Sequence, residues 1–148
     1  MTSIRAEFRL PPRPALSARV AAFVGELAAA AGFSRNAAYR LRLVCDELTA
    51  NIVEHGYGGR VGAISLCADY GPHCARLRIE HEASPFDPTA IEPVAPYGGP
   101  APPGRVGGAG LLLVRGSVDC FAYEYTQGRN RVFVAIRREE PDPRARPR

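Results

Sequence analysis

Hydrophobic residues recur with two different periods in the first third of the chain, and each period predicts one kind of element. Between residues 4 and 10 apolar side chains alternate with charged ones, which is the pattern of a strand with one buried face. From Leu16 to Leu27 the apolar spacing becomes three or four residues. This spacing predicts a helix, which the alanines 28–31 extend as far as Gly32.

A second helical stripe follows Ser34, whose side chain we expect to cap the helix. Glu47 and Asn51 are four residues apart and fall along one flank of this stripe, with His55 one turn further on. A half-buried carboxylate and amide need partners to offset their desolvation, and a bound metal or nucleotide would be such a partner. The alternative is that Asn51 and His55 only help to end the helix before Gly56. The apolar positions of the stripe are Ala37, Leu41, Val44, Leu48 and Ile52.

Alternation then returns in residues 64–70 and 75–81, on either side of a Gly-Pro-His turn, and predicts a hairpin with one wet face. The parity of the second strand puts His81 on the same inward face as Leu77 and Ile79. A histidine at such a position has two interpretations. It is either a functional group at the core end of its strand or a core histidine with satisfied hydrogen bonds.

Residues 93–110 are rich in proline and glycine and lead into an apolar helix that starts near Leu111. A connection of this length is usually a functional lid or a linker. Glycines before a helix N-terminus present free N–H groups that suit a phosphate, although a flexible connector with capping glycines has the same composition. Two more strands, near residues 121–125 and 132–136, flank a predicted turn at 127–130.

This order of elements predicts an α+β two-layer sandwich, in which helices cover one face of a mostly antiparallel sheet. We expect one domain over residues 1–138, with a lid at 93–110 and a flexible Pro/Arg tail at 139–148. The tail is too polar and proline-rich to pack.

The composition excludes several kinds of functional site. All 19 basic residues are arginine, so the lysine-dependent P-loop and a lysine Schiff base are excluded. Much of the net charge of +4 lies in the tail, and no basic stripe is interleaved with aromatics, so we expect no direct contact with nucleic acid. No apolar run reaches the roughly 18 residues of a membrane span. The N-terminus also lacks the pattern of a signal peptide, and we therefore expect a cytoplasmic protein.

Three stretches in this order resemble the GHKL superfamily of histidine-kinase-like ATPases, which includes gyrase, histidine kinases and MutL. The likeness is to its small branch of bacterial anti-sigma-factor serine/threonine kinases, and it runs from Ile4 to about Arg138. The segment 47–57 is similar to that branch's N box, and Pro85-Phe86-Asp87-Pro88 is similar to the end of its first glycine box. Residues 107–114 look like the second glycine box, and 128–130 resemble the closing hairpin.

The resemblance implies that the chain binds ATP with Mg²⁺. Asn51 would coordinate the Mg²⁺ that bridges the phosphates, and Glu47 would be the general base for the attacking hydroxyl. The phosphate acceptor would be a serine or threonine of an anti-sigma-factor antagonist, and the same domain would hold a sigma factor inactive, commonly as a homodimer. The other positions that the resemblance assigns to nucleotide binding are His55, His81, Ala83, Phe86, Asp87, Arg105, Gly107, Gly108, Ala109, Gly110 and Leu111.

The first glycine box departs from the family pattern. The family normally has Asp-x-Gly before Phe-Asp-Pro, the aspartate accepting a hydrogen bond from the adenine amino group, and the aligned positions here are His81 and Ala83. A neutral imidazole can accept one hydrogen bond but lacks the charge of the carboxylate, and the methyl of Ala83 crowds a close backbone approach. Losing one charge-assisted hydrogen bond would weaken binding about tenfold to a hundredfold.

Two functions therefore remain open. The first is an ATP-dependent protein serine/threonine kinase, and the second is a catalytically weak or inactive module that binds its protein partner on the same fold. A sensor-kinase fragment is a remoter alternative, since the helix at 16–31 contains no phospho-acceptor histidine.

Overall fold

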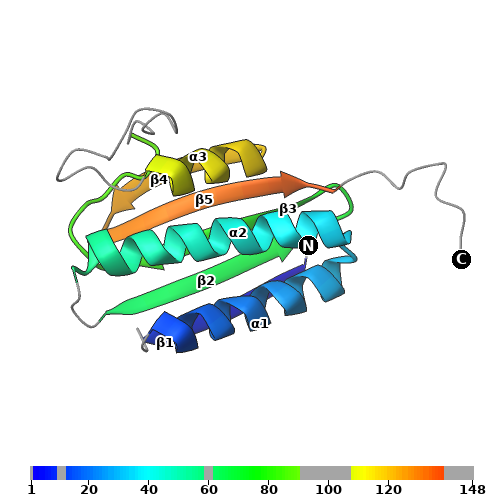
Figure 1. The fold of residues 1–148 in the computed structure, drawn as a ribbon, viewed down its shortest axis with the longest axis horizontal. Coiled ribbons are helices and arrows are strands. Elements are labelled where there is room, and N and C mark those ends of the chain that lie inside the picture. Colours follow the sequence, from blue (N-terminus) through cyan, green and yellow to red (C-terminus); the bar gives the residue numbers. More distant parts are fainter. Residues whose placement is uncertain (1, 10–12, 59–61, 91–107, 139–148) are drawn as a thin grey trace, which may run out of the picture.

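The computed structural model describes residues 2–9, 13–58, 62–90 and 108–138, which form one five-stranded antiparallel sheet with three helices on one of its faces (Figure 1). The strands lie in the order β1-β2-β3-β5-β4, and every neighbouring pair is antiparallel. The predicted α+β sandwich is confirmed. The elements in chain order are β1 (Thr2–Arg9), α1 (Arg13–Ala31), α2 (Arg35–Asn51), the short π-helix η1 (Ile52–Gly56), β2 (Ala63–Tyr70), β3 (Cys74–His81), α3 (Gly108–Ser117), β4 (Cys120–Thr126) and β5 (Arg129–Arg137).

The helix termini follow the local chemistry of the sequence. Ser34 is the N-cap of α2, as predicted, and its side chain accepts a hydrogen bond from the Ala37 N–H at 3.0 Å. The preceding helix α1 ends where Gly32 adopts φ +67°, a left-handed conformation that suits glycine. The N-terminus of α1 lies at Arg13, earlier than the apolar spacing indicates, because Pro14 is tolerated in the first turn of a helix.

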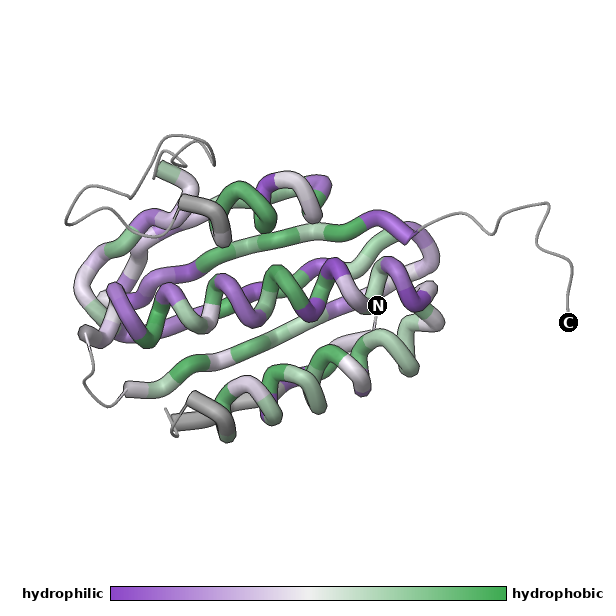
Figure 2. The backbone as a smooth tube through the Cα atoms, viewed as in Figure 1, coloured by the Kyte–Doolittle hydropathy of each residue, from purple (hydrophilic) through white to green (hydrophobic). Residues whose placement is uncertain are grey.

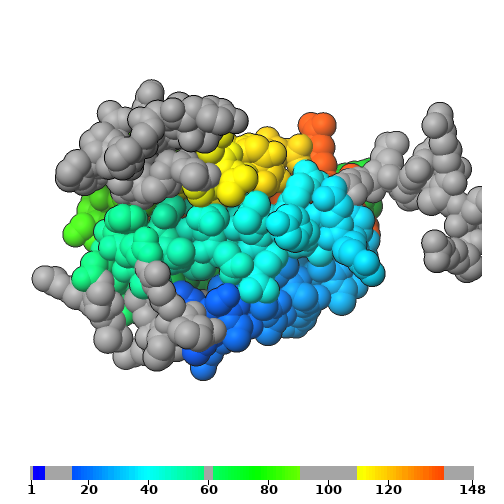
Figure 3. All heavy atoms as spheres, viewed as in Figure 1, coloured from blue at the N-terminus to red at the C-terminus, as the bar shows by residue number. Residues whose placement is uncertain are grey.

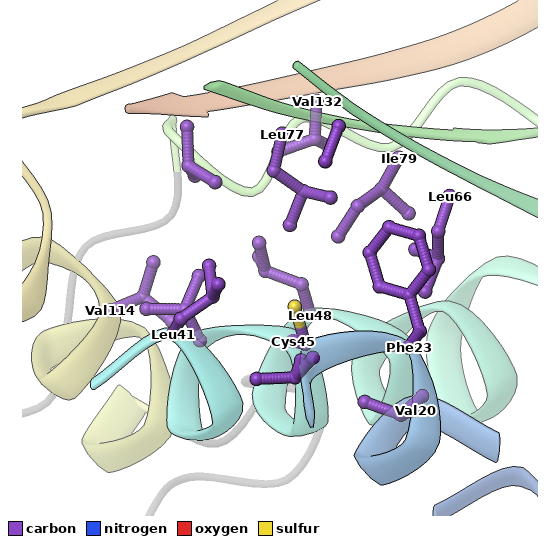
Figure 4. Close-up of a cluster of buried hydrophobic side chains, with 14 of the residues drawn as sticks. Val20, Phe23, Leu41, Cys45, Leu48, Leu66, Leu77, Ile79, Val114 and Val132 are labelled. Atoms are coloured by element: carbon purple, nitrogen blue, oxygen red, sulfur yellow. The ribbon is translucent and has the colours of Figure 1, made fainter. Parts of the chain in front are cut away.

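The core lies between the helices and the sheet (Figure 4). Figure 2 shows apolar positions that alternate with hydrophilic ones along α2 and a continuous apolar stretch through the middle of β5. The three helices lie side by side over the sheet, with α2 in contact with both α1 and α3 (Figure 3). Fully buried residues of the core include Val20, Leu27, Val44, Ile64, Ile79, Leu111 and Val114.

The opposite face of the sheet is polar. Its most buried charge is Glu80, whose carboxylate accepts ion pairs from Arg78 at 3.0 Å, Arg131 at 3.1 Å and Arg129 at 3.3 Å. A carboxylate with this little exposure needs such partners to offset its desolvation. The solvent-exposed face predicted for the 64–81 hairpin is therefore present, and arginine is its main charged residue.

Two details differ from the sequence interpretation. The turn between β4 and β5 is tighter than the predicted 127–130, because the left-handed residues Gln127 and Gly128 are enough to reverse the chain. Residues 108–110 of the predicted lid form the first turn of α3. The remainder of the lid, 93–107, and the tail 139–148 lie outside the described residues. Among the helices described, none is long and apolar enough to cross a membrane.

Candidate functional site

The C-terminal end of α2, the end of β3 and the start of α3 gather at one end of the molecule (Figure 1). Glu47 of α2 and Gly110 of α3 lie against each other, because a Cβ built on Gly110 would lie 2.1 Å from Glu47 Oε2. With any other residue at this position the Glu47 carboxylate would have to move from its present place. The first N–H groups of a helix have no partners within the helix, so the half-buried Glu47 lies beside backbone groups that can donate to a ligand.

Asn51 lies one turn after Glu47 and is 8% exposed. Its Nδ2 donates to no group among the described residues. A buried amide without a partner is unusual, because its desolvation is then not offset. The other buried polar residue of this helix segment, Thr49, is satisfied by the Cys45 carbonyl at 2.7 Å. The Nδ2 of Asn51 is thus a buried donor whose acceptor is not supplied by the described residues.

We expect Asn51→Ala to change the free energy of unfolding of the ligand-free protein by less than about 1 kcal/mol, because losing an unsatisfied amide offsets the lost packing. Thr49→Ala is the matched control and should cost about 1–2 kcal/mol, since it removes a satisfied buried hydrogen bond. Urea denaturation measures both. A destabilisation of Asn51→Ala well above that of Thr49→Ala would show that the amide has a structural partner.

The helix changes its geometry directly after Asn51. Residues 52–56 are π-helical, so His55 does not continue the flank of Glu47 and Asn51 as the α-helical spacing predicted. Its side chain is exposed and stacks on Phe86, with ring centroids 6.1 Å apart and an interplanar angle of 20°. His55 and Phe86 are therefore brought together, but at the surface and not along the core.

His81 ends β3 on the inward face, as its parity predicted, and is 1% exposed. Neither ring nitrogen has a hydrogen-bond partner among the described residues, so the interpretation as a satisfied core histidine is wrong. The ring is T-shaped against Tyr57, with centroids 5.7 Å apart, and a Cβ on Gly56 would lie 3.0 Å from Nε2. The end of the N box therefore encloses His81, and both of its ring nitrogens lack hydrogen-bond partners among the described residues.

A hollow of about 610 Å³ is lined by Gly56 and Tyr57, which both lie against this ring, whereas the buried His81 is not part of its lining. Tyr57 holds one wall in place, because its hydroxyl donates to the Ala63 carbonyl at 2.7 Å and accepts from the Glu82 N–H at 3.0 Å. The walls combine the end of the N box with the segment after β3. The lining residues are His55, Gly56, Tyr57, Gly58, Glu82, Ala83 and Ser84.

Burial lowers the pKa of the His81 imidazole from its ordinary 6.5 to about 4. The unfolded chain therefore binds a proton between pH 6.5 and 4 that the folded chain excludes. We expect this residue to lower the free energy of unfolding by about 1.4 kcal/mol per pH unit as the pH falls through this window, with no contribution above it.

The measurement is a denaturation series from pH 7.5 to 5 on the wild type and on His81→Asn. Because other groups also titrate in this range, the difference between the two proteins is the relevant quantity. Equal slopes in both proteins would contradict the assignment to His81.

A fully buried amide, Asn130, organises the segment between β3 and the lid. Its Oδ1 accepts from the Phe86 N–H at 2.9 Å and from the Tyr123 hydroxyl at 2.6 Å. Its Nδ2 donates to the Ala83 carbonyl at 2.9 Å and more weakly to that of Ser84 at 3.3 Å. From the sequence we expected Asn130 in a turn and assigned it no role. Its parity with Val132 and Val134 was the signal that could have identified it as inward-facing.

The other predicted site residues occupy different positions. Asp87 is engaged locally, because its Oδ1 accepts from the N–H and hydroxyl of Thr89. Leu111 is fully buried and anchors α3, and Gly108 and Ala109 lie in its first turn. Arg105 and Gly107 lie outside the described residues.

Comparisons with known proteins agree with this architecture. A family model described as histidine kinase-like ATPase domain matches residues 10–136. A solved structure of the RsbU and RsbW domains of Rv1364c from Mycobacterium tuberculosis is similar, with a TM-score of 0.65 and 17% sequence identity. The match covers 95% of this chain but 34% of that chain, so the present chain corresponds to about a third of it. The comparison with curated proteins gives no match.

Proposed function

Because this chain belongs to the histidine kinase-like ATPase domain family, we propose that it binds Mg²⁺ and ATP at the end of α2 and transfers the γ-phosphoryl group to a serine or threonine of a partner protein. The observation that carries the proposal is the contact between Glu47 and the first turn of α3 at Gly110, one helical turn from the unpartnered Nδ2 of Asn51. The likeness to a structure that contains an RsbW domain supports the regulatory branch of the family.

The residues present fit a magnesium–nucleotide complex. Asn51 is buried and its Nδ2 lacks an acceptor among the described residues, so this donor suits a phosphate oxygen, and the carbonyl oxygen of the same amide would hold Mg²⁺. Gly110 leaves space in front of Glu47 that any other residue would fill. The N-terminus of α3 offers free N–H groups and the positive end of a helix dipole, which suit a phosphate. When bound, Mg²⁺ supplies charge neutralisation to the phosphates.

In the proposed reaction, the Glu47 carboxylate accepts the proton of the attacking hydroxyl, so the oxygen can form its bond to phosphorus as the bond to the leaving phosphate breaks. Because Gly110 has no side chain, the Glu47 carboxylate can lie at the start of α3. In the proposed reaction the N-terminus of α3 stabilises the negative charge that develops during transfer. Asn51 would hold Mg²⁺, and the backbone of residues 107–110 would contact phosphate oxygens.

We further propose that the acceptor is an anti-sigma-factor antagonist and that the domain sequesters a sigma factor, as the family resemblance implies. A homodimer is part of the same proposal. The support for these partners is the family resemblance and the similarity to a structure with an RsbW domain. Partner choice depends on surface residues that carry no local motif.

A second function has one specific observation in its favour. His81 replaces a carboxylate that the family uses for adenine, and Ala83 adds a methyl to the wall of the hollow. Both changes weaken nucleotide binding, so a partner-binding module with little or no catalysis is the alternative. The alternative predicts a partner complex whose affinity does not depend on nucleotide.

The test is transfer of labelled phosphate from γ-labelled ATP with Mg²⁺ to candidate antagonist proteins from the same genome, followed by mass spectrometry of the modified residue. The proposal predicts one phosphoserine or phosphothreonine that disappears when this residue of the antagonist is changed to alanine. Stable complexes with sigma factor and no transfer to any antagonist would favour the binding module.

A further inference from the structure

The open face of the sheet, away from the three helices, carries a trough of about 410 Å³ along β2 (Figure 1). The side chains that β2 contributes to it, Ser65 and Cys67, are short, whereas the strands on both sides contribute arginine. Cys67 is paired with Arg5 of β1 and with Arg78 of β3. Because neighbouring strands lie about 4.8 Å apart, these two arginines stand on strands roughly 10 Å apart with a small thiol between them. We call this site the arginine trough.

The charges of the arginine trough are not balanced within it. The residues that line it include four arginines but a single carboxylate, Glu80, which already binds three of them. Two of these arginines also reach a carboxylate outside the trough. Arg129 binds Glu82 at 2.9 Å, and Arg131 binds Glu124 at 3.3 Å. The positive charges of Arg129 and Arg131 are therefore largely compensated by their neighbours.

The surplus positive charge belongs to Arg5 and Arg78. Arg5 is exposed and forms no ion pair with any side chain that the structure describes. Arg78 binds Glu80 through Nε at 3.0 Å and makes no second ion pair within the described residues. A guanidinium group has five N–H donors in a planar fork that matches the two oxygens of a carboxylate. The space between these two arginines therefore suits an anionic group.

The arginine trough continues into a second hollow of about 300 Å³ on the same face, because Cys67 and Arg78 line both. This apolar hollow is formed mainly by Phe133 and Ala135 of β5 and by Cys120 of β4. Phe133 is the register partner of Arg78, so the apolar ring and the guanidinium group stand on adjacent strands. A ligand that fills both hollows must carry an anionic group and, a few ångströms away, an apolar one.

We propose that the arginine trough and the apolar hollow form a docking surface for an acidic segment of a partner protein, with a carboxylate between Arg5 and Arg78 and an apolar side chain against Phe133. A second copy of this chain is a poorer occupant, because a two-fold contact through this face would set arginines against arginines or against the apolar hollow. A free anion would fill the arginine trough alone, and nucleic acid would leave the apolar hollow unused. The inference does not depend on the proposed function, since α2 and α3 lie on the other face of the sheet.

Three accessible cysteines report on the occupancy of this surface. Cys67 lines the arginine trough and Cys120 lines the apolar hollow, whereas Cys74 lines neither. The experiment measures the alkylation rate of each cysteine by iodoacetamide, read by mass spectrometry, over a titration with a synthetic peptide of alternating glutamate and leucine. We expect the peptide to slow the alkylation of Cys67 and Cys120 severalfold and to leave that of Cys74 unchanged.

Two variants remove the anion site in different ways. Arg5→Ser should weaken the peptide about tenfold, because it removes a charge-assisted hydrogen bond. Its matched control is Arg137→Ser, which changes the net charge equally at an exposed arginine that lines neither hollow. Cys67→Glu places a carboxylate of the chain itself between the two arginines, so the peptide should no longer protect Cys120. Binding of the ATP analogue should be the same in all three variants.

Three further probes distinguish the kinds of occupant: inorganic phosphate, an oligothymidylate, and the same peptide with glutamine in place of glutamate. We expect each to protect Cys67 and Cys120 less than the acidic peptide does. Equal protection by the glutamine peptide, or stronger protection by phosphate or oligothymidylate, would overturn the proposal. The same peptide affinity in Arg5→Ser and Arg137→Ser would also overturn it, as would the absence of any protection by the acidic peptide. None of these results would affect the proposed function, which depends on the opposite face of the sheet.

Discussion

Glu47→Gln lowers the rate of phosphoryl transfer by about a thousandfold, while the affinity for nucleotide changes by less than about threefold. Glutamine has nearly the same shape as glutamate but cannot accept the proton of the attacking hydroxyl. The contacts of the side chain with the start of α3 are kept, so the fold is unaffected. Single-turnover transfer to the antagonist and a separate binding titration give the two quantities.

Two glycines of α3 provide the control. In Gly110→Ala the new methyl would lie 2.1 Å from Glu47 Oε2 and would push the carboxylate aside, so transfer should also fall although Glu47 is present. Gly116 lies in the same helix with nothing within 4 Å of a Cβ, and Gly116→Ala should leave transfer unchanged. Full activity of Glu47→Gln would remove this residue from the role of base.

Asn130→Ala should lower the free energy of unfolding by about 3–4 kcal/mol, because it removes a fully buried amide and leaves several groups without partners. The Phe86 N–H, the Tyr123 hydroxyl and the Ala83 carbonyl all bond to this amide, and the Phe86 N–H also donates to the Tyr123 hydroxyl at 3.2 Å. We expect a decrease in the melting temperature of roughly 10 °C, measured by calorimetry. Hydrogen exchange of the Phe86 amide should accelerate more than exchange in the centre of β3.

Tyr123→Phe is the matched control, since it removes the hydroxyl's bond to Asn130 and its weaker bond from the Phe86 N–H but leaves the amide in place. Its cost should be about 1 kcal/mol. If Asn130→Ala destabilised the protein no more than Tyr123→Phe, Asn130 would not organise the segment of Ala83 to Phe86.

Most of the fold could be predicted from local patterns. The alternation of β2 and β3 determined which residues face inward, and it placed His81 in the core before any tertiary contact was known. The cap at Ser34 set the start of α2 and with it the phase of Glu47 and Asn51. These features depend on periodicities of two and 3.6 residues, which are properties of the sequence itself.

The details of the site depend on contacts between distant segments. The π-helix after Asn51 turns His55 outward, although α-helical spacing gives no indication of it. The approach of Gly110 to Glu47 joins residues that are far apart in the chain, and the role of Asn130 results from bonds to a segment more than forty residues earlier. Such placements follow from the packing of α3 on α2 and of β5 on β3.

The central claim is that the end of α2 and the start of α3 form a magnesium–nucleotide site. Its most direct measurement is titration of the imido analogue of ATP with Mg²⁺ into the wild type and into Asn51→Ala. We predict micromolar binding by the wild type that requires Mg²⁺ and is weakened about a hundredfold in Asn51→Ala. Absence of binding to the folded wild type, or binding that is the same without Mg²⁺ and without Asn51, would contradict the claim.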